Sequence, residues 1–177
     1  MIKISSKDRF ILKSFQDLFE QKKLFIIDCD AEEYFHNFEI SRSDNEIHVL
    51  LNKKNKLNWK IPTTFHKIFK KIYDNLSNNF IYISDMKYYP LKNTVESGSK
   101  KLQLSEIQNS ILLMLCLNLK NGINKEKLAK IIWPKDKEIS INKLDTHLTN
   151  LKNQLAKDLN FKLNFVSKSS LLKLIIN

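Results

Sequence analysis

The stretch ISINKLDTHLTNLKNQL, Ile139 to Leu155, decides how the second half of the chain is interpreted. Its apolar side chains recur at alternating steps of three and four, which predicts one buried stripe of an amphipathic helix. The opposite side carries amide, hydroxyl and lysine side chains and almost no acid. Such side chains allow a helix to approach the edges of nucleic-acid bases, so this side is a candidate surface for base recognition. The alternative is an ordinary solvated face in an asparagine-rich chain.

The segments around this helix predict two more helices and a hairpin. One helix is expected to open at Ser105 and close near Gly122, and a shorter helix follows the Asn124 cap. The apolar runs FKLNFVS and LLKLII, separated by KSS, predict a β-hairpin. Short strands are expected in front of the first helix: FIYIS, MKYYPL, NTVESG and KKLQLS. Three helices followed by a hairpin is the order of a winged helix-turn-helix domain.

The first half alternates between strand and helix patterns. MIKIS, KLFIIDC and NEIHVLLN predict strands, whereas SKDRFILKSFQDLFEQ, AEEYFHNF and PTTFHKIFKKIYDNL predict helices, the first of them capped by Ser6. The polar segment Ser77-Asn78-Asn79 is the expected boundary between domains 1–78 and 79–177. The expected fold class is α+β: a small α/β domain, then a winged helix-turn-helix domain with an N-terminal antiparallel sheet and a C-terminal hairpin.

Charge separates the two halves further. The 177-residue chain has a formal net charge of +11. Residues 1–78 hold 14 basic and 11 acidic side chains, whereas residues 79–177 hold 16 and 8. A net surplus of +11 favours a polyanionic partner, either nucleic acid or an anionic membrane surface, and the second half holds most of it. A lysine-rich solubilising surface is the alternative, because the abundance of Lys, Asn and Ile is typical of an AT-rich genome.

Other classes of protein find little support in the sequence. The N-terminus has no apolar segment suited to a signal peptide, and no run of 18 apolar residues occurs, so a cytoplasmic protein without membrane attachment is expected. Cys29 and Cys116 lie far apart, and no metal-ligand spacing is present. No nucleophile–base spacing or glycine-rich phosphate loop occurs either, so neither a catalytic residue, a metal nor a cofactor is expected.

Three motifs in order carry a resemblance to a known family. LQLSEIQNSILLML is similar to the pattern LT..E...L..L, INKEKLAKIIW ends in Trp133, and LDTHLTNLKNQL is similar to VDVHISRLRKKL. From about Phe80 onward the chain therefore resembles the DNA-binding domain of OmpR/PhoB-type response regulators. The chain departs from the family pattern at two places that concern base recognition: Asn150 stands where the family usually has Arg, and the wing SKSSLL has no Gly.

The resemblance implies a transcriptional regulator that places the helix 139–155 in the major groove of double-stranded DNA, as a homodimer. Trp133 and His147 would then contact phosphates, and the wing would meet phosphates or the minor groove. The candidate DNA-binding residues are Trp133, Asn142, Lys143, Thr146, His147, Thr149, Asn150, Lys152, Asn153, Ser167, Lys168 and Ser169.

Residues 1–78 resemble a degenerate, shortened receiver domain. Asp28, at the end of FIID, is the only candidate phosphoacceptor, but a single acid stands where receivers need a pair to hold Mg²⁺. A phosphorylation-independent domain that mediates dimerisation is therefore expected. The alternative function is a protein-interaction module, in which a winged helix without base recognition docks a protein such as RNA polymerase.

Overall fold

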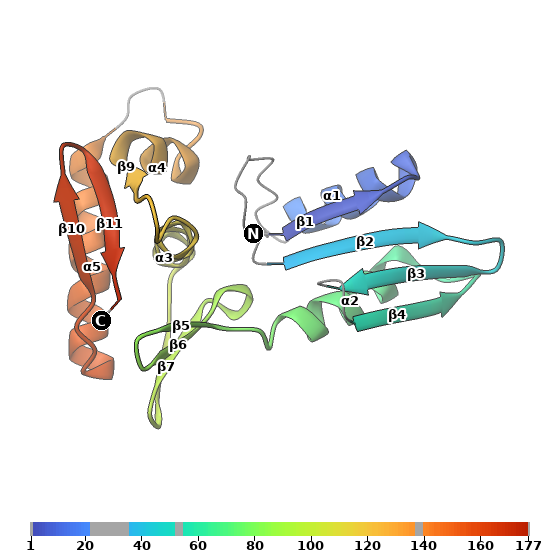
Figure 1. Cartoon of the computed structure of the whole chain (residues 1–177), viewed down its shortest axis with the longest axis horizontal. Coiled ribbons are helices and arrows are strands. Elements are labelled where there is room, and N and C mark those ends of the chain that lie inside the picture. The colour runs from blue at the N-terminus through green and yellow to red at the C-terminus, as the bar shows by residue number, and fades with distance from the viewer. Residues whose placement is uncertain (1, 22–35, 52–54, 137–139, 177) are drawn as a thin grey trace. The chain divides into compact units, whose positions relative to one another are not determined.

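The computed structural model describes residues 2–21, 36–51, 55–136 and 140–176. The chain divides into two compact units, Met1–Asn78 and Asn79–Asn177, and the boundary falls in the polar segment around Asn78. Each unit contains both helices and sheets (Figure 1), so the mixed α and β content expected from the sequence is confirmed.

Unit 1 contains a four-stranded sheet in the order β1-β2-β3-β4, formed by Ile2–Ser6, His36–Arg42, Glu46–Leu51 and Asn55–Lys60. β1 pairs with β2 in parallel, whereas the β2–β3 and β3–β4 pairs are antiparallel. A receiver domain has a doubly wound parallel sheet. The described sheet of unit 1 therefore differs from the receiver arrangement that the resemblance implied.

Two helices, α1 at Arg9–Gln21 and α2 at Phe65–Leu76, supply the core of unit 1. Their apolar stripes are buried and meet through aromatic contacts: the ring centroids of Phe19 and Phe69 lie 4.9 Å apart, edge to face. On β3, buried residues alternate with partly exposed ones, which is typical of a strand covered on one face. The buried core side chains of these elements are Ile11, Phe15, Phe19, Ile40, Ile47, Val49, Leu51, Ile68, Phe69, Ile72 and Leu76.

Three predictions for unit 1 require correction. The helix expected over AEEYFHNF is wrong for His36–Phe38, which belong to β2 and pair with β1, and Phe38 also pairs with β3. Strand β4 was missed, because only Leu57 and Trp59 mark its alternation. The cap of α1 is Asp8, whose carboxylate accepts hydrogen bonds from the N–H groups of the next turn. KLFIIDC, including Asp28, lies outside the described residues.

Unit 2 begins with an antiparallel sheet of four strands in sequence order: β5 Ile81–Ile83, β6 Met86–Tyr89, β7 Thr94–Ser97 and β8 Lys100–Gln103. A short 3₁₀ turn, η1, joins β6 to β7 at Pro90–Lys92. One face of this sheet is buried, and the Tyr88 hydroxyl there donates to the Asn109 side-chain oxygen at 2.7 Å. This bond connects the sheet to the helix that follows.

Three helices follow, α3 at Glu106–Leu117, α4 at Lys125–Ile132 and α5 at Ile141–Leu159. Ser105 and Asn124 cap α3 and α4, as predicted. α3 is buried along nearly its whole length, and burial raises the pKa of the Cys116 thiol to about 12. Two predicted boundaries were wrong: α3 ends at Leu117 rather than near Gly122, and α5 continues for one turn beyond Leu155.

The chain ends in the hairpin of β10 Asn164–Lys168 and β11 Leu171–Ile175, and β11 also pairs with the short strand β9, Ile123–Asn124. Figure 1 shows this hairpin alongside α5. Gly122 has φ +71°, and a Cβ there would lie 2.9 Å from the Leu172 carbonyl oxygen, so the close approach of the chain to β11 requires glycine. Helix, helix, helix, hairpin is the element order that the sequence predicted for this unit.

Candidate nucleic-acid interface

Helix α5 has one buried and one exposed face. Ser140 caps it by accepting a hydrogen bond from the Lys143 N–H at 3.3 Å. The buried stripe consists of Leu144, Leu148, Leu151, Leu155 and Leu159. The exposed face between its flanks consists of five uncharged polar residues, called here the amide face: Asn142, Thr146, Thr149, Asn150 and Asn153. The predicted amphipathic stripe is thus confirmed, and the five uncharged candidates on α5 come together on one surface.

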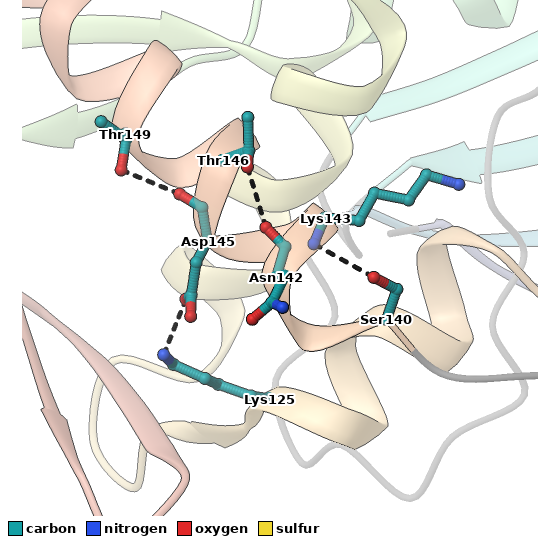
Figure 2. A network of polar contacts seen from close by, with 7 residues as sticks. All are labelled: Lys125, Ser140, Asn142, Lys143, Asp145, Thr146 and Thr149. Carbon is teal, nitrogen blue, oxygen red and sulfur yellow. Dashed lines mark hydrogen bonds and ion pairs between the residues drawn. The ribbon is translucent and has the colours of Figure 1, made fainter.

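Hydrogen bonds within α5 orient the amide face. The Thr146 hydroxyl donates to the Asn142 carbonyl, and the Thr149 hydroxyl donates to the Asp145 carbonyl, both at 2.9 Å. Figure 2 shows both contacts. With its proton directed back along the helix, each threonine keeps its oxygen lone pairs and its methyl group for an outside partner. The side-chain amides of Asn142, Asn150 and Asn153 make no hydrogen bond to another residue in the described part of the chain.

One flank of the amide face is an aromatic and cationic cluster at the end of α4. The Lys143 Nζ atom lies 4.4 Å from the centre of the Trp133 ring and 2.9 Å from the Asp136 Oδ2 atom. The His147 ring lies beside Trp133, with centroids 5.5 Å apart. Three candidate residues from the sequence therefore meet here. Asp136 was not among the candidates, although its carboxylate holds one of the expected phosphate ligands.

The other flank faces the hairpin. The Lys152 Nζ atom lies 5.9 Å from the centre of the Phe165 ring on β10. Nine positions separate Lys143 from Lys152, so at about 100° per residue they extend from opposite sides of the helix. The amide face therefore has a lysine on each side.

Lys125 is a second residue that sequence reasoning missed. Its ammonium group pairs with Asp145 on α5 at 2.7 Å (Figure 2), and its N–H donates to the Ser170 carbonyl at 2.8 Å. Only 15% of the Lys125 side chain is exposed, so the pair is less screened than a surface pair. This lysine joins α4, α5 and the hairpin turn. Asp145 and Ser170 lie 20 and 45 positions after Lys125 in the sequence, so no local sequence pattern could reveal these two contacts.

The hairpin presents the remaining candidates. Ser167, Lys168 and Ser169 are all exposed at its tip. Ser169 and Ser170 adopt positive φ values of 48° and 67°, which allows a tight turn without the usual glycine. The tip therefore carries hydroxyl groups and one lysine at the end of two paired strands.

Within the described ranges, no helix combines the length and apolar character that a membrane span requires. Nor do three or more His, Cys, Asp or Glu side chains gather there as metal ligands would. Asp28, the candidate phosphoacceptor, lies outside the described residues.

No family model and no curated protein matches the chain. Three solved structures are similar to this chain. They are the DNA-binding domain of CadC from E. coli, the C-terminal domain of the lantibiotic response regulator NsrR (the nisin resistance regulator), and a mutant of RitR. CadC is 13% identical over 57% of this chain and 95% of its own, with a TM-score of 0.49. NsrR is 25% identical over 47% and 84%, with a TM-score of 0.38. RitR is 14% identical over 66% and 55%, with a TM-score of 0.42. All three scores are below 0.5, so the function has to be inferred from the geometry of this chain.

Proposed function

We propose that this protein is a DNA-binding transcriptional regulator that inserts α5 into the major groove of double-stranded DNA. The observation that carries the proposal is the amide face, an uncharged hydrogen-bonding surface with Lys143 on one side and Lys152 on the other. A helix that enters the groove has bases in front of it and phosphates on both sides. The arrangement of α5 matches that pattern of charge.

The amide face supplies base recognition in this proposal. Asn142, Asn150 and Asn153 can each make paired hydrogen bonds with the N6 and N7 groups of adenine. The methyl groups of Thr146 and Thr149 can contact the methyl group of thymine, because their hydroxyl protons are already used within the helix. We therefore expect a target site rich in A·T pairs.

The flanks and the hairpin supply phosphate contacts. Lys143 and Lys152 bind backbone phosphates on the two sides of the groove, and the Trp133 N–H and the His147 ring add contacts beside Lys143. Ser167, Lys168 and Ser169 reach a phosphate or the minor groove from the hairpin tip. Because each lysine that binds a phosphate releases a counterion, binding weakens steeply with salt.

Unit 1 provides self-association in this proposal, independently of phosphorylation at Asp28. The protein then binds as a homodimer to two half-sites whose centres lie roughly one helical turn apart.

The first test is a fluorescence-anisotropy titration of the full chain against duplex pools at two salt concentrations, followed by selection and sequencing. An enriched motif together with a steep salt slope supports the proposal. In the enriched site, Asn150→Ala and Asn153→Ala should relax specificity at single positions, whereas Lys152→Ala should weaken binding to every sequence about equally. If the full chain did not bind any duplex at physiological salt, the proposal that it is a DNA-binding regulator would be rejected.

A second candidate function is a module that docks RNA polymerase, and the outer face of the hairpin favours it. Val166, Leu171 and Ile175 are 52%, 43% and 36% exposed on adjacent strands. Exposed apolar side chains on neighbouring strands suit a protein partner better than a phosphate backbone. A polymerase pull-down that survives Lys143→Ala and Lys152→Ala but is lost with Val166→Ser would favour this function over DNA binding.

A further inference from the structure

The outer face of the sheet β5–β8 carries exposed aromatic rings and lysines. Side chains alternate across this sheet: Ile83, Met86, Tyr88 and Val95 are buried against the core. The opposite side, called here the ring–lysine face, carries Phe80, Tyr82, Lys87, Tyr89, Glu96 and Lys101. These residues contribute little to the core of unit 2, so their composition requires another explanation.

Three rings form a connected group on this face. The Phe80 and Tyr82 rings meet edge to face at 4.9 Å, and the Phe80 and Tyr89 rings are tilted at 5.4 Å. Tyr82 is 58% exposed and Phe80 is 37% exposed. Edge-to-face contacts hold the rings in place while leaving part of the Tyr82 ring open to a flat partner.

Lysines surround the rings. The Lys87 Nζ atom lies 5.2 Å from the centre of the Phe80 ring, and the Lys92 Nζ atom lies 5.5 Å from the centre of the Tyr89 ring. Strand register places Tyr82, Lys87, Glu96 and Lys101 in one row across the four strands. Lys87, Lys92 and Lys101 outnumber the single acid Glu96 among the charged residues on this face and beside its rings, so it is positively charged.

The acid in the middle of the row is neutralised locally. Glu96 pairs with Lys101 at 3.1 Å and also accepts a hydrogen bond from the Tyr89 hydroxyl. The hydrogen bond from Lys101 lowers the pKa of Glu96, so the carboxylate stays ionised and engaged at neutral pH. Lys87 and Lys92 lie over the rings, so an anionic ligand stacked on the rings would lie close to both ammonium groups.

We propose that the ring–lysine face binds single-stranded nucleic acid, with bases stacked on Tyr82 and its neighbouring rings and phosphates close to Lys87 and Lys92. Proteins that bind single strands without strict sequence preference combine exposed aromatic side chains with a positively charged path for the backbone. An acidic peptide would satisfy the lysines but offers no flat ring to the tyrosines. The site uses different residues from α5, so it does not depend on the proposed duplex binding.

The test is a fluorescence-anisotropy titration of the full chain against an oligothymidylate and an abasic strand of equal length. The abasic strand keeps every phosphate and removes every base. Stacking predicts that the abasic strand binds about tenfold more weakly, and that Tyr82→Ala weakens oligothymidylate binding about tenfold. Lys87→Ala should also weaken binding, whereas Lys130→Ala, which removes the same charge from the exposed side of α4, should not.

Measuring duplex affinity in the same variants distinguishes single-strand binding by the ring–lysine face from the proposed duplex binding by α5. Tyr82→Ala should leave duplex affinity unchanged, whereas the double variant Lys143→Ala, Lys152→Ala should lose duplex binding and keep oligothymidylate binding. Because Tyr82 is mostly exposed, its variant should retain the circular dichroism spectrum of the parent. Equal affinity for the oligothymidylate and the abasic strand would overturn the proposal. So would polyglutamate binding that depends on Tyr82, since it would identify an acidic peptide as the ligand.

Discussion

At the residue scale, Lys143 shows how a side chain expected to bind phosphate is held before a ligand arrives. It contacts the Trp133 ring and the Asp136 carboxylate. The two side chains of this ion pair are 41% and 45% exposed, so water and salt weaken it. A DNA phosphate would have to replace the carboxylate, and Asp136 therefore competes with DNA for the same ammonium group.

Asp136→Asn should raise the affinity for duplex DNA. The substitution removes the competing carboxylate from Lys143 and a repulsive charge from the interface, and we expect a gain of roughly threefold to fivefold at low salt. Anisotropy titration with duplex DNA measures this gain in affinity. Asp158→Asn is the matched control, because it makes the same change in net charge at an exposed position near the far end of α5. An equal gain in both variants would show that only net charge matters.

The Ser169-Ser170 turn is a second feature at this scale, because both residues have positive φ. Ser170→Gly should stabilise unit 2 by roughly 0.5–1 kcal/mol, since relief of left-handed strain exceeds the entropy cost of glycine. Urea denaturation measures the free energy of unfolding. Ser167→Gly, the same substitution within strand β10, should be destabilising instead. A loss of stability at Ser170 would contradict the strain argument.

At the element scale, α5 has one face that is buried in the core and an opposite face to which we assign the proposed base recognition. Leu151 is 0% exposed, whereas Asn153, two positions later, is exposed. Helical periodicity alone produces this separation, because two positions correspond to about 200° around the axis.

Leu151→Ala should destabilise unit 2 by about 2–5 kcal/mol through the cavity it leaves in the core. Asn153→Ala should change the free energy of unfolding by less than about 0.5 kcal/mol and reduce affinity for the selected duplex. Urea denaturation followed by Trp133 fluorescence in a Trp59→Phe background reports on unit 2 alone. A large loss of stability in Asn153→Ala would place that residue in the core rather than in the interface.

At the scale of the whole molecule, each unit has its own helices and its own buried core, with one described sheet in unit 1 and two in unit 2. A unit that buries its own apolar residues is expected to fold without its neighbour. Residues 79–177 also carry the larger share of the positive charge.

A fragment comprising residues 79–177 should therefore fold cooperatively and bind one half-site, whereas the full chain should bind two half-sites more tightly. Linked binding raises the effective concentration of the second contact, so the full chain should gain about a hundredfold or more on a two-site duplex. Sedimentation and anisotropy measurements on one-site and two-site duplexes test this. Equal affinity of fragment and full chain for the two-site duplex would remove the role proposed for unit 1.

Local sequence patterns were sufficient to predict the helices of unit 2, the caps at Ser105 and Asn124, and the hairpin. Each depends on residues within a few positions of one another, and side-chain periodicity and capping act over that range. The same kind of pattern failed for β2 and β4, because each strand has only two alternating apolar residues, Phe38 and Ile40 or Leu57 and Trp59. Pairing with neighbouring strands completes them.

The sequence by itself determined which residues line the amide face, because helix geometry places residues of known spacing on one side. Only the tertiary structure decided what flanks that face: Asp136 holding Lys143, Lys125 joining Asp145 to the hairpin turn, and Lys152 over Phe165. It also decided that Phe80, Tyr82 and Tyr89 share one surface with Lys87. These contacts depend on how strands and helices pack, and packing brings together residues that no local spacing relates.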